Sequence, residues 1–231
     1  MCGRYALNIS GDDLALEFAA GNANAAFTPS NWNISPTTPI PFIASDNLAG
    51  DSRTIQMGRW GLIPSWAKDA SRQANAINAR VESIAEKPTF KSAFKSRRCL
   101  IPATGYFEWA TELGQYPSKQ PFFIQRQDKK QLAMAGIYEN GTAAIITKEA
   151  EGFLAGIHHR MPLFLPNDDW QSWLDPKITD EVSARDLINH GLSPESAGLN
   201  AHPVSNQVNF VRNNSASLLL EIPLGEAQTL L

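Results

Sequence analysis

Hydrophobic residues occur along most of this 231-residue chain in runs of about four to eight, divided by Gly, Pro, Asn and Asp. Runs of this length between turn residues are typical of β-strands. Turns are expected at Gly114, at residues 128–130 and at residues 140–141. The strands that this pattern predicts span residues 5–7, 40–44, 54–62, 99–110, 122–127, 131–138 and 143–147.

Helical patterns are confined to short segments. They predict helices at residues 12–20, 89–96, 168–174 and 180–190, the first capped by Ser10 or Asp12. Residues 21–38 and 67–77 are expected to be irregular, and a looser tail follows the last helix. Because the strands follow one another and do not alternate with helices, we predict an α+β fold. Its core would be a mostly antiparallel, barrel-like sheet with peripheral helices, in a single domain over residues 1–231.

The composition is that of an ordinary globular protein, with 43% hydrophobic and 19% charged residues. No apolar run reaches the roughly 18 residues that span a bilayer. The start of the chain also lacks the basic and apolar regions of a secretion signal. We therefore expect a cytoplasmic, monomeric protein with no membrane partner.

The two cysteines, Cys2 and Cys99, could form a disulfide or remain free. The absence of a leader favours two free thiols. Cys99 lies in an apolar run, where a small buried hydrophobic side chain is expected. Cys and His residues are not clustered at the spacing of metal ligands, so we expect neither a metal nor another cofactor.

The formal net charge of −3 conceals an uneven distribution. Residues 52–130 contain 14 Lys and Arg against 6 Asp and Glu, whereas the other residues contain 6 against 17. A basic middle within an acidic chain is typical of a localised groove for an anion. On charge alone, a solvated basic face explains the pattern equally well.

The first chemically reactive group is Cys2, because removal of Met1 would make it an N-terminal aminothiol. Its α-amine, with a reference pKa near 8, would be partly neutral at physiological pH. A nearby cation such as Arg4 would favour the thiolate. Amine and thiol together suit an aldehyde, first as a Schiff base and then as a thiazolidine ring. They also suit acyl transfer, and an unremarkable terminus is the third alternative.

Two further segments contain groups that suit nucleic acid. Trp60 and Trp66, beside Gly and Pro, could stack on unpaired bases or could belong to the core. Asn78, Arg80 and Glu82 would lie on one side of an extended segment and present an amide, a guanidinium and a carboxylate. The alternative is an internal Arg–Glu pair that holds a loop.

Proton transfer has two candidate groups. Glu108, among aromatic residues on an apolar strand, is suited to it if burial raises the pKa of its carboxyl, and unsuited if it points to solvent. His158 and His159 are possible acid–base groups. Adjacent residues of a strand face opposite sides, so only one of the two imidazoles would line a site. A structural histidine is the alternative.

Taken in order, these segments resemble the SRAP family, the SOS-response-associated peptidases or abasic site processing proteins. The resemblance covers about residues 2–165 and is specific because several blocks recur in order from a fixed start. The blocks are Met1-Cys2-Gly3-Arg4-Tyr5, residues 60–66, residues 78–82, Arg98-Cys99-Leu100-Ile101-Pro102, Gly105-Tyr106-Phe107-Glu108-Trp109 and residues 158–162.

The resemblance implies a β-rich fold with a basic groove for single-stranded DNA, and a covalent link between Cys2 and the aldehyde of an abasic site. It implies that Asn78 holds the sugar or the adduct, and that Glu108 lies beside the Cys2 amine and helps to open the abasic sugar. His158 would be the acid–base and phosphate-side group that stabilises the adduct. The residues that would line the DNA path are Arg4, Pro36, Trp60, Trp66, Arg80, Thr147 and Arg160.

Further activities follow from the same resemblance. Removal of Met1 would be autocatalytic or the work of an aminopeptidase, and the Schiff base would permit weak strand cleavage by β-elimination. The family usually has an acidic residue where this chain has His159, so pH dependence is expected to differ. Two alternatives remain: a thiol peptidase or N-terminal-nucleophile amidohydrolase that uses Cys2, and a non-catalytic module that binds single strands.

Overall fold

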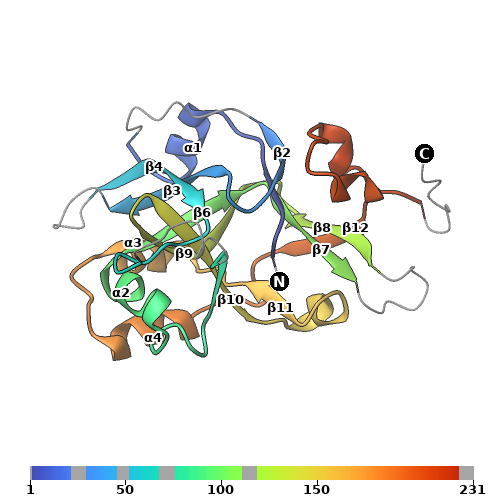
Figure 1. Ribbon diagram of the computed structural model, residues 1–231. Coiled ribbons are helices and arrows are strands. Elements are labelled where there is room, and N and C mark those ends of the chain that lie inside the picture. Colours follow the sequence, from blue (N-terminus) through green and yellow to red (C-terminus); the bar gives the residue numbers. More distant parts are fainter. Residues whose placement is uncertain (1, 22–29, 46–51, 68–75, 111–118, 224–231) are drawn as a thin grey trace.

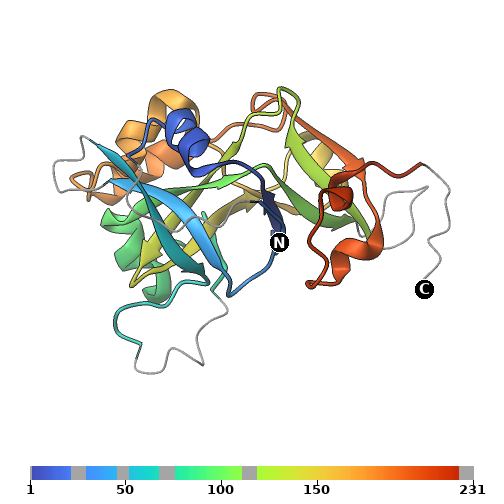
Figure 2. The same ribbon diagram turned by 90° about the horizontal axis from the view of Figure 1, so that it is seen from above.

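The computed structural model describes residues 2–21, 30–45, 52–67, 76–110 and 119–223 (Figure 1). The strands fall into two groups, a barrel and a second sheet. In both views the start of the chain lies between the barrel and the second sheet (Figures 1 and 2).

Five strands close into a barrel in the order β4-β3-β6-β9-β10, with β10 returning to β4. All neighbours in this circuit are antiparallel except β4 and β10, which are parallel. Two short strands, β5 and β11, extend β10 beyond the barrel. The bounds are β3 Pro39–Ser45, β4 Arg53–Trp60, β5 Asn78–Arg80, β6 Arg98–Ala103, β9 Leu132–Glu139, β10 Thr142–Glu149 and β11 Arg160–Pro162.

The second sheet is antiparallel throughout, in the order β12-β8-β7-β1-β2. The chain crosses from the barrel into this sheet at Thr104, whose backbone N–H donates to the carbonyl of Ala6. Gly105 follows because a Cβ there would lie 2.3 Å from the ring of Phe123. The bounds are β1 Tyr5–Leu7, β2 Asn31–Ile34, β7 Gly105–Ala110, β8 Gln120–Arg126 and β12 Leu199–Pro203.

The helices begin at residues suited to the position. The Ser10 side chain accepts the N–H of Asp13 and caps the first helix, the Asp180 side chain caps the last, and Pro88 opens α2. Phe90, Phe94 and Trp173 pack on the outside of the barrel. The helices are α1 Gly11–Glu17, α2 Pro88–Ser96, α3 Trp170–Leu174 and α4 Glu181–Asn189, with short 3₁₀ turns η1 Gly152–Gly156, η2 Asn167–Asp169, η3 Asn206–Asn209 and η4 Ala216–Leu219.

The predicted class, an α+β fold with a mostly antiparallel barrel-like core, is confirmed. The predicted single strand at 99–110 is wrong, because the chain changes sheets at Thr104. The irregular stretch 21–38 contains β2 and the looser tail contains β12, since both complete the second sheet. The turn expected at Gly114 lies outside the described residues. Among the described residues, no helix has the length and apolar character needed to cross a membrane.

Candidate active site at the start of the chain

Strand pairing places the first residues against β7. Tyr5 lies opposite Tyr106, and the N–H of Phe107 donates to the carbonyl of Arg4 over 2.9 Å. Continuing this antiparallel pairing brings residues 2–4 beside the end of β7 that carries Glu108. Cys2 has no exposed surface and belongs to the core shared by the barrel and the second sheet.

Asn78 approaches the same point from the barrel. It opens β5, which pairs in parallel with β10 and places Asn78 opposite Ile145. The Asn78 side-chain amide donates to the carbonyl of Cys2 over 2.8 Å. This hydrogen bond connects the barrel to the start of the chain, and the structure therefore brings these two predicted site residues together.

Glu108 is 4% exposed, so the alternative of a solvent-facing side chain is excluded. Burial raises the pKa of its carboxyl to about 7. Burial, followed by the negative charge of Glu108, raises the pKa of the Cys2 thiol far above its usual value. The two groups are electrostatic neighbours, and near neutral pH Glu108 can either accept or donate a proton.

His158 and His159 precede β11 and lie on no strand, so the prediction that they face opposite sides is wrong. Their rings stack with centroids 4.3 Å apart. Burial, and then the positive amino end of the chain, lower the pKa of His158 to about 4, which makes it neutral. Its Nδ1 accepts the N–H of Arg160 over 3.0 Å, so the proton of the neutral ring is on Nε2.

Arg160 is buried, and its guanidinium binds other residues of the protein. It donates to both carboxylate oxygens of Glu82, over 2.6 and 3.0 Å, and to the carbonyl of Thr147 over 2.6 Å. The hydrogen bond from Arg160 lowers the pKa of Glu82. The partner of Glu82 is thus Arg160 and not Arg80, which is exposed. The role expected for Arg160 on the DNA path is corrected to an internal ion pair.

The two tryptophans have opposite environments. Trp60 is fully buried, its indole N–H donates to the carbonyl of Ile77, and its ring meets Tyr5 edge-on at 5.2 Å. Stacking of Trp60 on a base is therefore corrected to a place in the core. Trp66 is 55% exposed and presents its ring at the surface.

The other residues expected on the DNA path differ in accessibility. Thr147 has no exposed surface, so contact with DNA there is corrected to a place in strand β10. Pro36, in the turn between β2 and β3, is half-buried. The residues of this set with side chains accessible to DNA are therefore Trp66, Arg80 and Pro36. Arg4 lies half-buried beside the nucleophile.

Arg4 is held by residues that sequence reasoning missed. Its guanidinium donates to the Asn33 side chain over 2.8 Å and to the Val208 carbonyl over 2.7 Å. The Asn33 amide in turn donates to three carbonyls of the C-terminal segment, those of Val208, Phe210 and Asn213. Nothing in a lone Asn between apolar residues indicates this role, because its partners lie about 175 residues away. Arg4 therefore orders the surroundings of Cys2: Asn33 and Val208 hold its guanidinium, and its backbone N–H is one of the groups that lower the pKa of the Cys2 thiol.

Some of the Lys and Arg residues in the basic middle of the chain are buried or paired with carboxylates of the protein. Arg98 is 2% exposed, and burial lowers the pKa of its guanidinium to about 10. Arg97 pairs with Glu139, and Arg126 pairs with Asp128. The surplus is therefore smaller at the surface than in the sequence. The guanidinium of Arg98 donates to the carbonyls of Trp173, Phe94, Lys95, Ile178 and Asp175.

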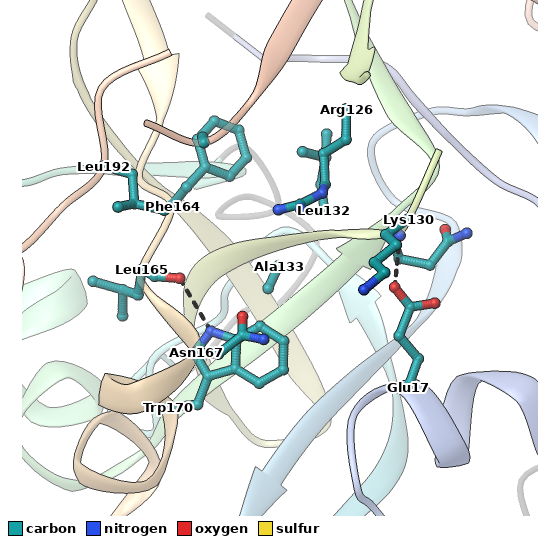
Figure 3. A pocket seen from close by; sticks show the side chains of 12 residues that line it. Glu17, Arg126, Lys130, Leu132, Ala133, Phe164, Leu165, Asn167, Trp170 and Leu192 are labelled. Carbon is teal, nitrogen blue, oxygen red and sulfur yellow. Dashed lines mark hydrogen bonds between the residues drawn. The ribbon is translucent and has the colours of Figure 1, made fainter. Parts of the chain in front are cut away.

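A cavity of about 400 Å³ lies elsewhere, between α1, the β8–β9 connection and α3 (Figure 3). Two of its charged groups have partners within the protein: Glu17 accepts the N–H of Gln131, and Arg126 pairs with Asp128. None of the predicted site residues lines this cavity. In the part of the chain that the structure describes, no three His, Cys, Asp or Glu side chains are grouped to hold a metal.

Comparison with known proteins gives the family. The family model for SOS response associated peptidase (SRAP) matches residues 1–211. The chain is 36% identical over 230 residues to the abasic site processing protein YoaM of Bacillus subtilis, covering 95% of this chain and 97% of YoaM. It is 31% identical to the abasic site processing protein YedK of Escherichia coli, covering 95% and 99%. The chain belongs to the SRAP family, as its motifs predicted.

Solved structures share the fold. A protein from Bacteroides thetaiotaomicron matches with a TM-score of 0.81 at 23% identity, covering 96% of this chain and all of that one. A phage-related protein from Bordetella bronchiseptica matches with a TM-score of 0.68 at 26% identity, again covering 96% of this chain and all of the other. The barrel with its second sheet is therefore an established arrangement.

Proposed function

We propose that this protein processes abasic sites in single-stranded DNA by forming a covalent link through Cys2. The observation that carries the proposal is the convergence of Cys2, Asn78 and Glu108 at the start of the chain. The names of the relatives, abasic site processing proteins, point to the same lesion. An abasic sugar in its open form carries an aldehyde, which is the group that an N-terminal aminothiol captures.

The chemistry proceeds in two steps after Met1 is removed. The Cys2 α-amine adds to the aldehyde carbon, and loss of water leaves an imine. The thiol sulfur then adds to the imine carbon, the S–H proton passes to nitrogen, and a thiazolidine ring closes. Glu108, with a pKa of about 7, is suited to take the thiol proton and to deliver it.

The neighbours of Cys2 suit these steps. Asn78 fixes the carbonyl of Cys2 and thereby orients the aminothiol. Neutral His158 has its proton on Nε2, and an N–H group at this position suits an oxygen of the opened sugar. Until Met1 leaves, the Cys2 nitrogen is an amide and cannot form an imine, so processing controls activity.

DNA would bind through exposed aromatic and basic side chains. Trp66 offers a ring on which a base can stack, and Arg80 offers a cation for phosphate. Contacts of this kind are independent of sequence and weaken with salt. A missing base also removes the cost of unstacking it.

The same imine permits β-elimination, so we propose a weak strand-cleaving activity beside the crosslink. The thiol peptidase alternative has less support, because a histidine with a pKa of about 4 is a poor base for the Cys2 thiol at neutral pH. Hydrolysis of a peptide by the purified protein, unchanged by abasic DNA, would favour that alternative.

Intact mass spectrometry tests the proposal directly. The purified protein is measured alone and after incubation with an abasic single-stranded oligonucleotide, with an undamaged oligonucleotide as control. We expect a mass without Met1, and a second species heavier by the oligonucleotide minus one water for abasic DNA alone. Processed protein that forms no such species would overturn the proposal.

A further inference from the structure

A row of exposed cations follows Asn78 along the chain. Arg80 ends β5, Lys87 caps the start of α2, and Lys91 and Lys95 lie on that helix. We call these three lysines the lysine ridge. Within the described part of the chain, none of the three forms an ion pair with a carboxylate. The ridge therefore keeps its positive charge at the surface.

Two carboxylates share a hollow with the ridge, and both bind other groups. Asp180 and Glu181 line a cavity of about 190 Å³ together with two lysines of the ridge. The Asp180 carboxylate accepts the N–H of Ser183, and Glu181 pairs with Arg185. Because these acids are already bound, the lysines are available to an anion from outside. Two acids that precede α2 are bound in the same way, in the pairs Glu82–Arg160 and Glu86–Arg185.

The geometry of α2 arranges the ridge as a repeat. Its lysines are spaced four residues apart, so they lie on one side of the helix with successive residues about 6 Å apart along its axis. Phe90, Ala93 and Phe94 pack into the core and fix the helix in place. Evenly spaced cations on a rigid element suit a polymer with repeating phosphates better than a single small anion.

Trp66 connects the ridge to the candidate site. Its indole N–H donates to the carbonyl of Pro88 over 3.4 Å, which places its exposed ring at the first turn of α2. Between β5 and α2 the chain is tightly wound. The N–H of Ser83 donates to the carbonyl of Arg80 over 3.1 Å, and the N–H of Lys87 donates to the carbonyl of Ser83 over 3.0 Å. Arg80, the ring and the ridge therefore form one continuous surface that begins beside Asn78.

We propose that the lysine ridge binds the phosphates of the single strand on one side of the abasic site. The strand runs from Cys2 past Arg80 and Trp66 and then along α2. The inference rests on the proposed function, because the lesion fixes where this strand begins. A nucleic-acid strand supplies both partners that the surface needs, since its phosphates meet the ridge and an unpaired base stacks on Trp66. Neither contact reads the sequence.

Fluorescence anisotropy tests the ridge with the double variant Lys91→Ala, Lys95→Ala. The probes are single strands that carry a tetrahydrofuran abasic analogue, which has no aldehyde, at one end. One probe extends about ten nucleotides from the analogue on the 5′ side, and the other extends equally on the 3′ side. We expect the affinity of the double variant to fall about fivefold for one of the two probes only. For that probe the slope of log affinity against log salt should decrease by about 1.4, the value of two phosphate contacts.

Matched variants separate the ridge from net charge. Lys129→Ala, Lys130→Ala removes the same charge from exposed lysines in the β8–β9 connection, and it should leave the affinity for both probes unchanged. Trp66→Ala should weaken binding of the same probe as the ridge variant. All three variants should melt at the temperature of the unmodified protein, because the side chains that they remove are exposed. Annealing a complementary strand to the flank should also weaken binding, since a paired base cannot stack on Trp66.

The outcomes distinguish this inference from the proposed function. Unchanged binding of both probes by the ridge variant, equal losses for both probes, or an equal loss in the control variant would overturn the ridge. Tighter binding of the annealed flank would overturn its assignment to a single strand. Because the analogue cannot form a crosslink, none of these results depends on the covalent chemistry. Absence of an adduct between the unmodified protein and a true abasic strand would instead overturn the proposed function.

Discussion

The two cysteines of this protein are equally buried and differently surrounded. Cys2 and Cys99 both have no exposed surface, both are free thiols, and burial raises the pKa of both. Cys99 lies in β6, where its sulfur is 2.9 Å from the position that a Cβ on Gly136 would take. Cys2 instead has Asn78 and Glu108 as polar neighbours. Burial alone does not make a cysteine a structural residue, because its polar neighbours determine what it can do.

The largest expected difference comes from replacing each cysteine by alanine. Cys2→Ala should abolish the covalent adduct with abasic DNA and leave much of the non-covalent binding, since it removes the sulfur that closes the ring. Cys99→Ala should keep the adduct and lose roughly 1–2 kcal/mol of stability to a small cavity. Denaturing gels and chemical unfolding measure the two effects. An adduct that survives in Cys2→Ala would contradict the mechanism.

Glu108 gives the next largest effect, through pH. A carboxyl whose pKa is raised from 4.5 to about 7 binds its proton more tightly in the folded state. Folding stability from this group is complete below pH 4.5 and is lost as the pH rises to 7, by up to about 3 kcal/mol. Glu108→Gln should remove that loss, and it should slow crosslinking because no proton acceptor remains.

Unfolding curves of the Glu108→Gln variant and the unmodified protein, measured from pH 4 to 8, check this prediction. Glu139→Gln is a matched control on the barrel, since Glu139 is also 4% exposed but pairs with Arg97. A constant stability difference between Glu108→Gln and the unmodified protein across this range would argue against a raised pKa.

Asn78→Ala should have an intermediate effect on the Cys2 side. It removes the 2.8 Å hydrogen bond that fixes the Cys2 carbonyl, so crosslinking should slow by about tenfold, the value of one well-placed hydrogen bond. The free energy of unfolding should change by less than the activation free energy of crosslinking, because Asn78 is only partly buried. Asn78→Asp, which keeps the size and loses the donor, should resemble alanine. Normal rates in both variants would remove Asn78 from the site.

The smallest effect is expected for a surface cation near each cysteine. Arg80 follows Asn78 on β5 and is exposed, whereas Arg97 precedes the strand of Cys99 and pairs with Glu139. Arg80→Ala should weaken binding to single-stranded DNA and lower the salt dependence by about one phosphate contact. Arg97→Ala should leave both unchanged. Equal effects would place the DNA path elsewhere.

Local signals in the sequence were sufficient for much of the fold. Residues 5–7, 122–126 and 132–138 form strands within a residue or two of the prediction, because apolar runs and turns are local properties. The strands at Asn31–Ile34 and Leu199–Pro203 were missed. Each is short and polar at several positions, and it is extended because it pairs with a distant strand.

The residues of the candidate site stay a prediction from the motifs, whereas their geometry came from the structure. The order of the motifs was enough to select Cys2, Asn78, Glu108 and His158. It could not indicate that His158 and His159 stack, because that depends on the chain leaving strand geometry before β11. It also could not separate Trp60 from Trp66, since both belong to one motif and only packing decides which ring is buried.

The sequence by itself determined the chemistry that is possible: a thiol at position 2, one candidate carboxyl among aromatic residues, and a fold of many short strands. The tertiary structure decided which groups meet. Arg160 became an internal ion pair with Glu82, and the amide of Asn78 met the carbonyl of Cys2. The physical reason is that charge and acidity depend on burial and neighbours, and these come from residues far apart in the chain.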